Sequence, residues 1–193
     1  RKHSIVRRAV LTSTDWNLIR FCPAPVLLVS DQEVIRGKPV VAAIDVCNAD
    51  EKHAELNHTV LDQATVVAEV VESKVHCVNA WNVSSAVMAA GSIDPTPYEI
   101  AHAKKNDHLE ASKALCGEYN IPSDRIIVEE GTAEFVINTA AEELGAGLLV
   151  IGTVARRGIS GLFIGNTAEA VLEGSSIDIL VVKQADFECP LDL

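Results

Sequence analysis

Short apolar runs of strand length alternate along this chain with longer segments in which apolar residues recur at helical spacing. The run KPVVAAID, residues 38–45, is rich in valine, whereas residues 51–71 place Leu56, Val60 and Leu61 on one helical stripe. Strict alternation of this kind is typical of parallel strands in a doubly wound sheet. The sequence therefore predicts an α/β fold with strands at 38–45, 74–81, 125–131, 147–152 and 178–183, and helices at 51–71, 98–119, 132–144 and 167–173.

A five-stranded parallel sheet with this connectivity has the expected strand order 3-2-1-4-5, because right-handed crossovers must cover both faces. The order reverses between the first and fourth strands, whose carboxyl ends are Asp45 and Gly152. Ligands of open α/β sheets bind at such a reversal, so we expect a crevice there. In it Asp45 would accept a hydrogen bond from a ribose or an adenine amine; as a plain loop residue it would only form a turn.

A glycine-containing stretch, GTVARRGISGLFIGNT, follows the fourth strand. Its last residues, Gly165, Asn166 and Thr167, begin a helix, and the N–H groups and dipole of a helix N-terminus favour an anion. This arrangement predicts a phosphate site. The alternative is that Asn166 or Thr167 merely caps the helix.

An internal repeat accounts for the first part of the chain. Residues 12–32 align without gaps on residues 165–185, with Val26 to Val29 over Ile179 to Val182. We therefore interpret residues 1–32 as the last helix and strand of a first domain and residues 37–190 as a complete second domain; chance similarity is the alternative. An unpaired edge strand is a liability, so Val26 to Val29 should pair with residues 178–183, within the chain or across a dimer. The chain begins with arginine, which suggests a fragment or a processed product.

The composition excludes several classes of partner. The net charge of -11 opposes binding to nucleic acid and to anionic lipid, which both require basic residues. No apolar stretch reaches the roughly 18 residues of a membrane helix, so we expect no membrane insertion. The five cysteines are scattered and odd in number, which indicates reduced thiols and a cytoplasmic protein.

Catalytic chemistry finds little support in the sequence. His53 and His58 lie five residues apart on a helix, which does not match the spacing of metal ligands. No P-loop lysine and no nucleophile turn are present. We therefore predict no catalytic residue and no metal site, and expect a bound nucleotide to be sensed or slowly hydrolysed.

The strand that ends in Asp45, the spaced residues Gly152, Ala155, Gly165 and Asn166, and the closing strand DILVVK resemble a universal stress protein domain of the tandem type. The resemblance covers about residues 37–190, and residues 1–32 resemble the end of a preceding copy. It implies the fold described above, a stress-response role without a common catalysed reaction, and a homodimer or tandem pair joined through the closing strands. It also implies nucleotide-binding positions: Asp45 and Ala80 around adenine and ribose; Ile151, Gly152 and Ala155 at the first glycine loop; and Gly165, Asn166 and Thr167 at the phosphate end.

Two positions depart from the binding pattern of the family. Ala155 replaces its second glycine, and Asn166 replaces the usual serine or threonine. We therefore expect ATP, ADP or AMP to bind weakly or not at all. Two hypotheses follow: a ligand-sensing stress protein with an adenine nucleotide in its crevice, or an interaction or lipid-type ligand-binding module whose loop 82–97 offers apolar surface.

Overall fold

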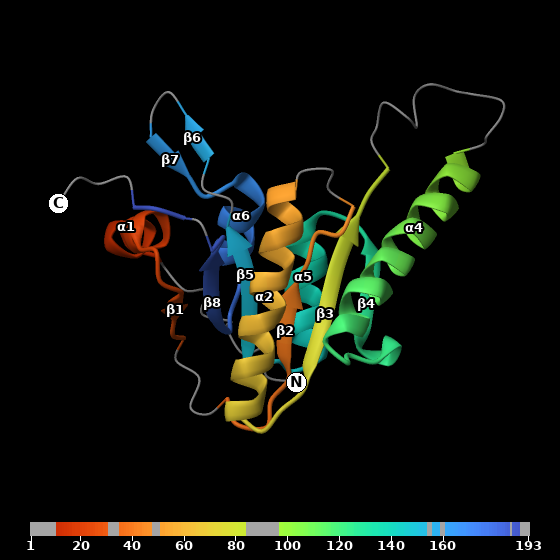
Figure 1. The fold of residues 1–193 in the computed structure, drawn as a ribbon, viewed down its shortest axis with the longest axis horizontal. Coiled ribbons are helices and arrows are strands. Elements are labelled where there is room, and N and C mark those ends of the chain that lie inside the picture. Colours follow the sequence, from red (N-terminus) through yellow and green to blue (C-terminus); the bar gives the residue numbers. More distant parts are fainter. Residues whose placement is uncertain are drawn as a thin grey trace, which may run out of the picture.

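The computed structural model describes residues 11–30, 35–47, 51–83, 97–153, 156–158, 161–185 and 187–189. A mixed six-stranded sheet lies between two layers of helices, with α2 on one face and α5 on the other (Figure 1). The predicted α/β class is confirmed. The helices are α1 (Ser13–Phe21), α2 (Glu51–Val70), α4 (Pro97–Glu118), α5 (Ala133–Glu143) and α6 (Asn166–Gly174); the strands of the sheet are β1 (Val26–Leu28), β2 (Val40–Ala43), β3 (Val75–Trp81), β4 (Ile126–Glu130), β5 (Leu148–Thr153) and β8 (Asp178–Lys183).

The strand order across the sheet is β1-β8-β5-β2-β3-β4. Parallel pairing joins β2 to β3 and to β5, β3 to β4, and β5 to β8, whereas β1 runs antiparallel to β8. The sheet therefore has six strands and is mixed, because β1, which was predicted apart from the five parallel strands and expected to pair with residues 178–183, adds an antiparallel strand at the edge. The chain leaves β2 toward β3 on one side and returns to its other side through β5.

Alternate residues of each buried strand serve two separate cores. Val40 and Ala42 of β2 pack beneath α2, while Val41 between them packs beneath α5 and α6. A parallel sheet buried on both faces requires such continuous apolar strands. All six residues of β8 are buried, as expected for a strand that lies between β1 and β5.

A short hairpin replaces part of the glycine-containing loop. β6 (Arg156–Gly158) pairs antiparallel with β7 (Gly161–Phe163) in a separate two-stranded sheet. Neither strand was predicted from the sequence, because each has only three residues and four of the six are glycine or arginine. Figure 1 shows the hairpin beyond the carboxyl end of β5.

β1 is fastened to β8 at both ends of the strand pair. At one end the backbone N–H and the hydroxyl of Ser30 both donate to Oδ1 of Asp178, at 2.7 Å each. At the other end the Nζ of Lys183 donates to the carbonyl oxygen of Cys22, the C-cap residue of α1. Asp178 and Lys183 are buried, so these hydrogen bonds satisfy polar groups that would otherwise be costly. Of the two pairings expected for this segment, the structure shows the one within the chain, and β8 has a strand on each side.

The pairing of β1 with β8 has the symmetry of two equivalent strands. Leu27 lies opposite Leu180, and these two residues also correspond in the gap-free alignment of the repeat. On either side Val26 pairs with Val181 and Leu28 with Ile179, so the register is the same read from either strand. The aligned helices α1 and α6 each have nine residues. The pairing of β1 with β8 is thus symmetric about the Leu27 and Leu180 pair.

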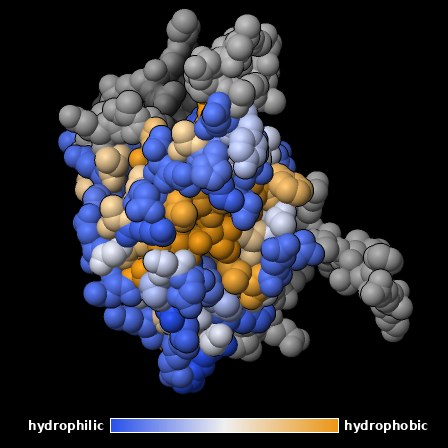
Figure 2. Space-filling view, turned by 90° about the vertical axis from the view of Figure 1, so that its right-hand side faces the viewer, coloured by the Kyte–Doolittle hydropathy of each residue, from blue (hydrophilic) through white to orange (hydrophobic). Residues whose placement is uncertain are grey.

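The opposite edge of the sheet is formed by β4. Figure 2 views the molecule from this side and shows apolar residues at the centre of the face, framed by hydrophilic ones. Ile126 and Ile127 of the edge strand are only half-buried. Among the described residues, no helix combines the length and the apolar character needed to cross a membrane.

A glycine in β5 lets α2 approach the sheet closely. A Cβ atom on Gly152 would lie 2.5 Å from Cγ of Leu56 and 2.6 Å from its Cδ2, well inside normal contact. Leu56 is buried in the core beneath α2. Gly152 is therefore required by packing, whatever ligand lies beyond the strand.

We predict that Asp178→Ala lowers the free energy of unfolding by about 1–3 kcal/mol, because it leaves two donors of Ser30 without their acceptor in a part-buried position. Urea unfolding measures the loss. Asp124→Ala, at an exposed site, is the matched control. An unchanged unfolding free energy in Asp178→Ala would show that β1 is not fastened to β8 in solution.

We also predict that Gly152→Ala destabilises the fold by roughly 1–3 kcal/mol through overpacking against Leu56. Leu56→Ala alone should cost about 2–5 kcal/mol as a core truncation. In the double variant the new methyl group enters the space that Leu56 vacates, so its unfolding free energy should exceed the additive value. Strict additivity in this cycle would contradict the close contact.

Candidate functional site

A cavity of about 540 Å³ opens at the carboxyl ends of β2 and β5, where the chain diverges to the two sides of β2. A volume of this size is typical of small-molecule sites. Ile44 and Asp45 follow β2, Ile151 and Gly152 belong to β5, and α2 and α6 supply further walls. The cavity thus lies at the reversal of strand order.

The residues proposed from the sequence come together at this cavity. Its lining includes Asp45, Ala80, Ile151, Gly152, Gly165, Asn166 and Thr167. Ala155 lies outside the described residues. Residues that the sequence analysis did not propose also line the cavity, among them His53, Leu56, Asn57 and Val60 of α2 and Ala133 and Ile137 of α5.

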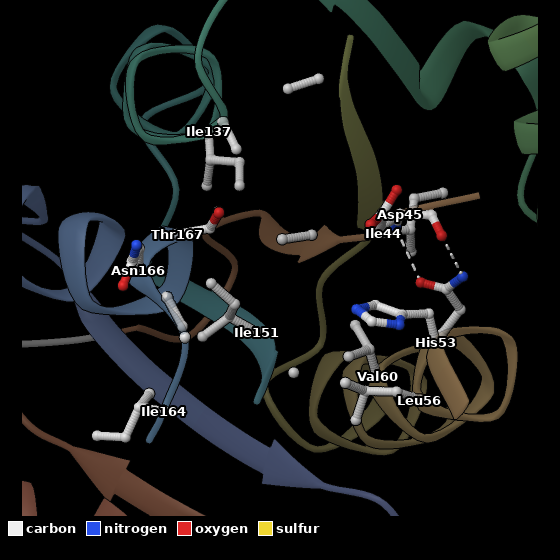
Figure 3. Close-up of a pocket in the computed structure, with 17 residues that line it drawn as sticks. Ile44, Asp45, His53, Leu56, Val60, Ile137, Ile151, Ile164, Asn166 and Thr167 are labelled. Atoms are coloured by element: carbon white, nitrogen blue, oxygen red, sulfur yellow. Dashed lines mark hydrogen bonds between the residues drawn. The ribbon is translucent and has the colours of Figure 1, made fainter. Parts of the chain in front are cut away.

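The two polar groups of the cavity lie at opposite sides of it. Figure 3 shows Asn166 and Thr167 on one side, Asp45 and His53 on the other, and Ile151 between them. Most of the remaining lining is aliphatic, and among the residues that the structure describes, none that lines the cavity is lysine or arginine. The arrangement fits an elongated ligand with an apolar middle and a different polar group at each end.

The N-terminus of α6 forms one of these ends. Gly165 is its N-cap residue, with φ of +100°, and no side chain makes a capping hydrogen bond there. Asn166 is the first helical residue instead of the cap, so the capping interpretation of Asn166 and Thr167 was wrong. The first helical hydrogen bond joins the N–H of Glu169 to the carbonyl of Gly165. The N–H groups of the first turn therefore have no acceptor within the helix and, together with the helix dipole, favour an anion.

α1 provides a comparison, because it is the aligned helix of the repeat. Its N-cap Thr12 forms a capping box with Asp15: the side chain of Thr12 accepts from the N–H of Asp15, and the carboxylate of Asp15 accepts from the N–H of Thr12. These hydrogen bonds from Thr12 lower the pKa of Asp15. In α6 the aligned residues are Gly165 and Ala168, so the capping box is absent, and the acidic residue of its first turn is Glu169.

Two buried asparagines hold the other end of the cavity. The side-chain amide of Asn57 accepts from the N–H of Asp45 and donates to its carbonyl oxygen, both at 2.9 Å. Nδ2 of Asn79 donates to the carbonyl oxygen of Ile44, also at 2.9 Å. In this way side chains take over the role of a neighbouring strand where β2 has ended. In the sequence, Asn79 is marked by its place within an apolar strand and Asn57 by its place beside the apolar stripe of a helix. Neither was predicted as a site residue.

His108 of α4 completes this polar cluster. Its Nδ1 lies 2.6 Å from Oδ1 of Asn79, and both side chains are buried. Burial lowers the pKa of His108, and Lys104 adds to the effect, whereas Asp45 and Asp107 oppose it. Partial desolvation, together with the negative charges of Asp107 and Asp45, raises the pKa of the Cys47 thiol although the residue is exposed, which makes it a poor nucleophile. Within the described part of the chain, no cluster of His, Cys, Asp and Glu is arranged to hold a metal ion.

Comparison with known proteins assigns this fold to a family. Residues 38–183 match the universal stress protein family. Universal stress protein E of Escherichia coli K12 is 36% identical over 195 residues, which cover all of this chain and 61% of that protein. The chain thus spans about three fifths of that relative.

Two solved structures agree with this result. A protein of unknown function from Pseudomonas aeruginosa PAO1 has 32% identity and a TM-score of 0.77, covering 96% of this chain and 61% of its own. A universal stress protein from Archaeoglobus fulgidus, at 20% identity and a TM-score of 0.53, covers 85% of this chain and 51% of its own, and shows the fold alone. Since the matched residues make up most of its length, the chain belongs to the universal stress protein family.

Proposed function

We propose that this protein serves the stress response by binding an adenine nucleotide, ATP, ADP or AMP, in the cavity between Asp45 and the N-terminus of α6. The observation that carries the proposal is the placement of a carboxylate residue and an uncapped helix N-terminus on opposite sides of one cavity. A nucleotide has hydroxyl and amine donors at one end and an anion at the other. Its base would contact the aliphatic lining between them.

The phosphate would be bound by the N–H groups of Asn166, Thr167 and Ala168 and by the dipole of α6. The lining residues that the structure describes include no lysine or arginine, so this part of the cavity offers few charges to hold additional phosphates. We therefore infer that the first phosphate provides most of the binding at this end. The described lining residues likewise offer no cation to stabilise a transferring phosphoryl group, which supports ligand sensing over catalysis.

The aliphatic lining favours a second candidate, an apolar ligand of lipid type in the same cavity. Ile44, Leu56, Ile137, Ile151 and Ile164 surround its middle. Such a ligand would use the helix N-terminus for an acidic headgroup or not at all. Mass spectrometry of molecules released from the purified protein distinguishes the two candidates, because a nucleotide and a lipid differ in mass and in solvent partitioning.

We infer further that residues 1–32 are the end of a preceding domain and that residues 37–190 form a second one. The symmetric pairing of β1 with β8, the equal lengths of α1 and α6, and the coverage of 61% of the Escherichia coli relative support this division. In this arrangement β1 occupies the place that the closing strand of a second subunit would take in a homodimer. The capping box of Asp15 would close the corresponding anion site in the first domain.

The thiols support a cytoplasmic location. All five cysteines are free, and Cys77 and Cys116 share a hydrogen bond in the core without being joined. That hydrogen bond raises the pKa of Cys77 and lowers that of Cys116. Adjacent reduced cysteines are typical of a reducing compartment.

We predict that Asn166→Asp weakens the binding of AMP but leaves the binding of adenosine unchanged. The substitution keeps the size of an exposed side chain and places a carboxylate where the phosphate would lie. The same charge should stabilise the fold by about 0.3–1 kcal/mol, since an acidic residue in the first turn complements the helix dipole. Calorimetric titration with AMP and adenosine, and thermal unfolding of the free protein, measure the two opposite effects.

Asn120→Asp is the matched control, because it adds the same charge at an exposed position beyond the end of α4. It should alter the affinity for AMP by less than about two-fold. Equal AMP affinities in the parent and in Asn166→Asp would remove the phosphate from the N-terminus of α6. Lack of AMP and adenosine binding by the parent would overturn the nucleotide proposal and favour the apolar ligand.

A further inference from the structure

A chain of hydrogen bonds connects α4 to the cavity through the interior of the protein. His108 contacts Asn79 at 2.6 Å, and Asn79 contacts the carbonyl oxygen of Ile44 at 2.9 Å. Ile44 lines the cavity and precedes Asp45, whereas His108 and Asn79 do not belong to the lining. The two side chains therefore do not contact a ligand in the cavity, and their hydrogen bonds act on it through the backbone of Ile44 and Asp45.

The direction of each hydrogen bond in this chain is fixed by chemistry. The carbonyl of Ile44 only accepts, so the amide nitrogen of Asn79 must face it. The amide oxygen of Asn79 then faces Nδ1 of His108 and accepts from it. Nδ1 therefore carries the proton in both the neutral and the charged imidazole.

Burial makes this chain stiff. His108 is 6% exposed and Asn79 is 1% exposed, so neither can replace a lost partner with bulk water. A missing donor at position 108 would leave the oxygen of Asn79 unsatisfied, and the amide would have to turn or draw water inward. Either change releases the carbonyl of Ile44.

The two hydrogen bonds between Asn57 and the backbone of Asp45 restrict how Asp45 can bind a ligand. Both backbone groups of Asp45 are taken by the amide of Asn57. The position of the Asp45 side chain then depends on where Asn57 and Asn79 hold the two consecutive residues. An ionised carboxylate only accepts hydrogen bonds, so at this end a ligand must present a hydroxyl or amine donor.

We propose that His108 and Asn79 are positioning residues, which hold Ile44 and Asp45 where the Asp45 carboxylate can accept from the hydroxyl or amine donors of the ligand. This inference rests on the adenine-nucleotide function proposed above. Under this proposal, the ligand affinity contributed by each end of the cavity can be changed independently of the other end. Substitutions at His108 affect the nucleoside end, while substitutions at Asn166 affect the phosphate end.

The test compares His108→Leu with His108→Asn. Leucine fills a similar volume without a donor, whereas the Nδ2 of asparagine can take the place of the imidazole Nδ1. We expect His108→Leu to weaken adenosine and AMP by the same factor, about ten-fold, the scale of one buried hydrogen bond left incomplete. His108→Asn should stay within about two-fold of the parent for both ligands. His102→Leu, at an exposed position of the same helix, is the matched control.

Amide hydrogen exchange of Asp45 in the free protein provides a readout that does not depend on binding. His108→Leu should accelerate this exchange about ten-fold, His108→Asn should restore it, and amides of β8 should not change. Unchanged exchange at Asp45 in His108→Leu, or equal losses of affinity in both variants, would overturn the positioning role. If the parent binds neither ligand while the exchange pattern appears as expected, the nucleotide proposal fails and the hydrogen-bonded chain stands as a structural element alone.

Discussion

The site depends on how the chain is held just beyond the end of β2. Past Ala43 the N–H of Ile44 still donates to the carbonyl oxygen of Val78 in β3, whereas the carbonyl of Ile44 and both backbone groups of Asp45 need other partners. The side chains of Asn57 and Asn79 supply them, at 2.9 Å for each hydrogen bond. Because these partners are side chains and not another strand, the space between β2 and β5 stays open at this end. The cavity results from these side-chain hydrogen bonds, which take the place of strand pairing, together with the reversal of strand order.

The opposite side of the cavity is the N-terminus of α6, where no side chain makes a capping hydrogen bond. α1 and α6 are aligned helices of equal length, yet Thr12 and Asp15 form a capping box at the N-terminus of α1, whereas no side chain caps α6. Glycine is favoured at position 165, since the φ of +100° at this N-cap is costly for any residue with a Cβ atom, and glycine brings no side chain that could cap the helix. The capping box therefore provides hydrogen-bond partners at the N-terminus of α1, whereas the N-terminus of α6 can bind an anion. The two aligned helices thus have equal lengths but different N-terminal caps.

Much of this arrangement could be predicted from the sequence, and the rest required contacts between distant segments. The closing strand was predicted with its bounds, 178–183, because it is a short apolar run between helix-ending and polar residues. The juxtaposition of Asp45 with Gly152 followed from topology. By contrast, Asn57, Asn79 and His108 belong to three elements, and their burial arises only when α2 and α4 pack on the sheet. Gly152 was assigned to ligand approach, although the contact that requires it is with Leu56, over ninety residues away in sequence.

The central claim is that one cavity binds the two ends of a nucleotide with different elements. Nitrogen-15 NMR titration tests it most directly, because each backbone amide reports on its own surroundings. With AMP, we predict shifts at the amides of Asn166, Thr167 and Ala168 and at Asp45; with adenosine, we predict shifts at Asp45 and not at the first turn of α6. The same set of shifted amides for both ligands, or shifts confined to residues outside the cavity, would contradict the account.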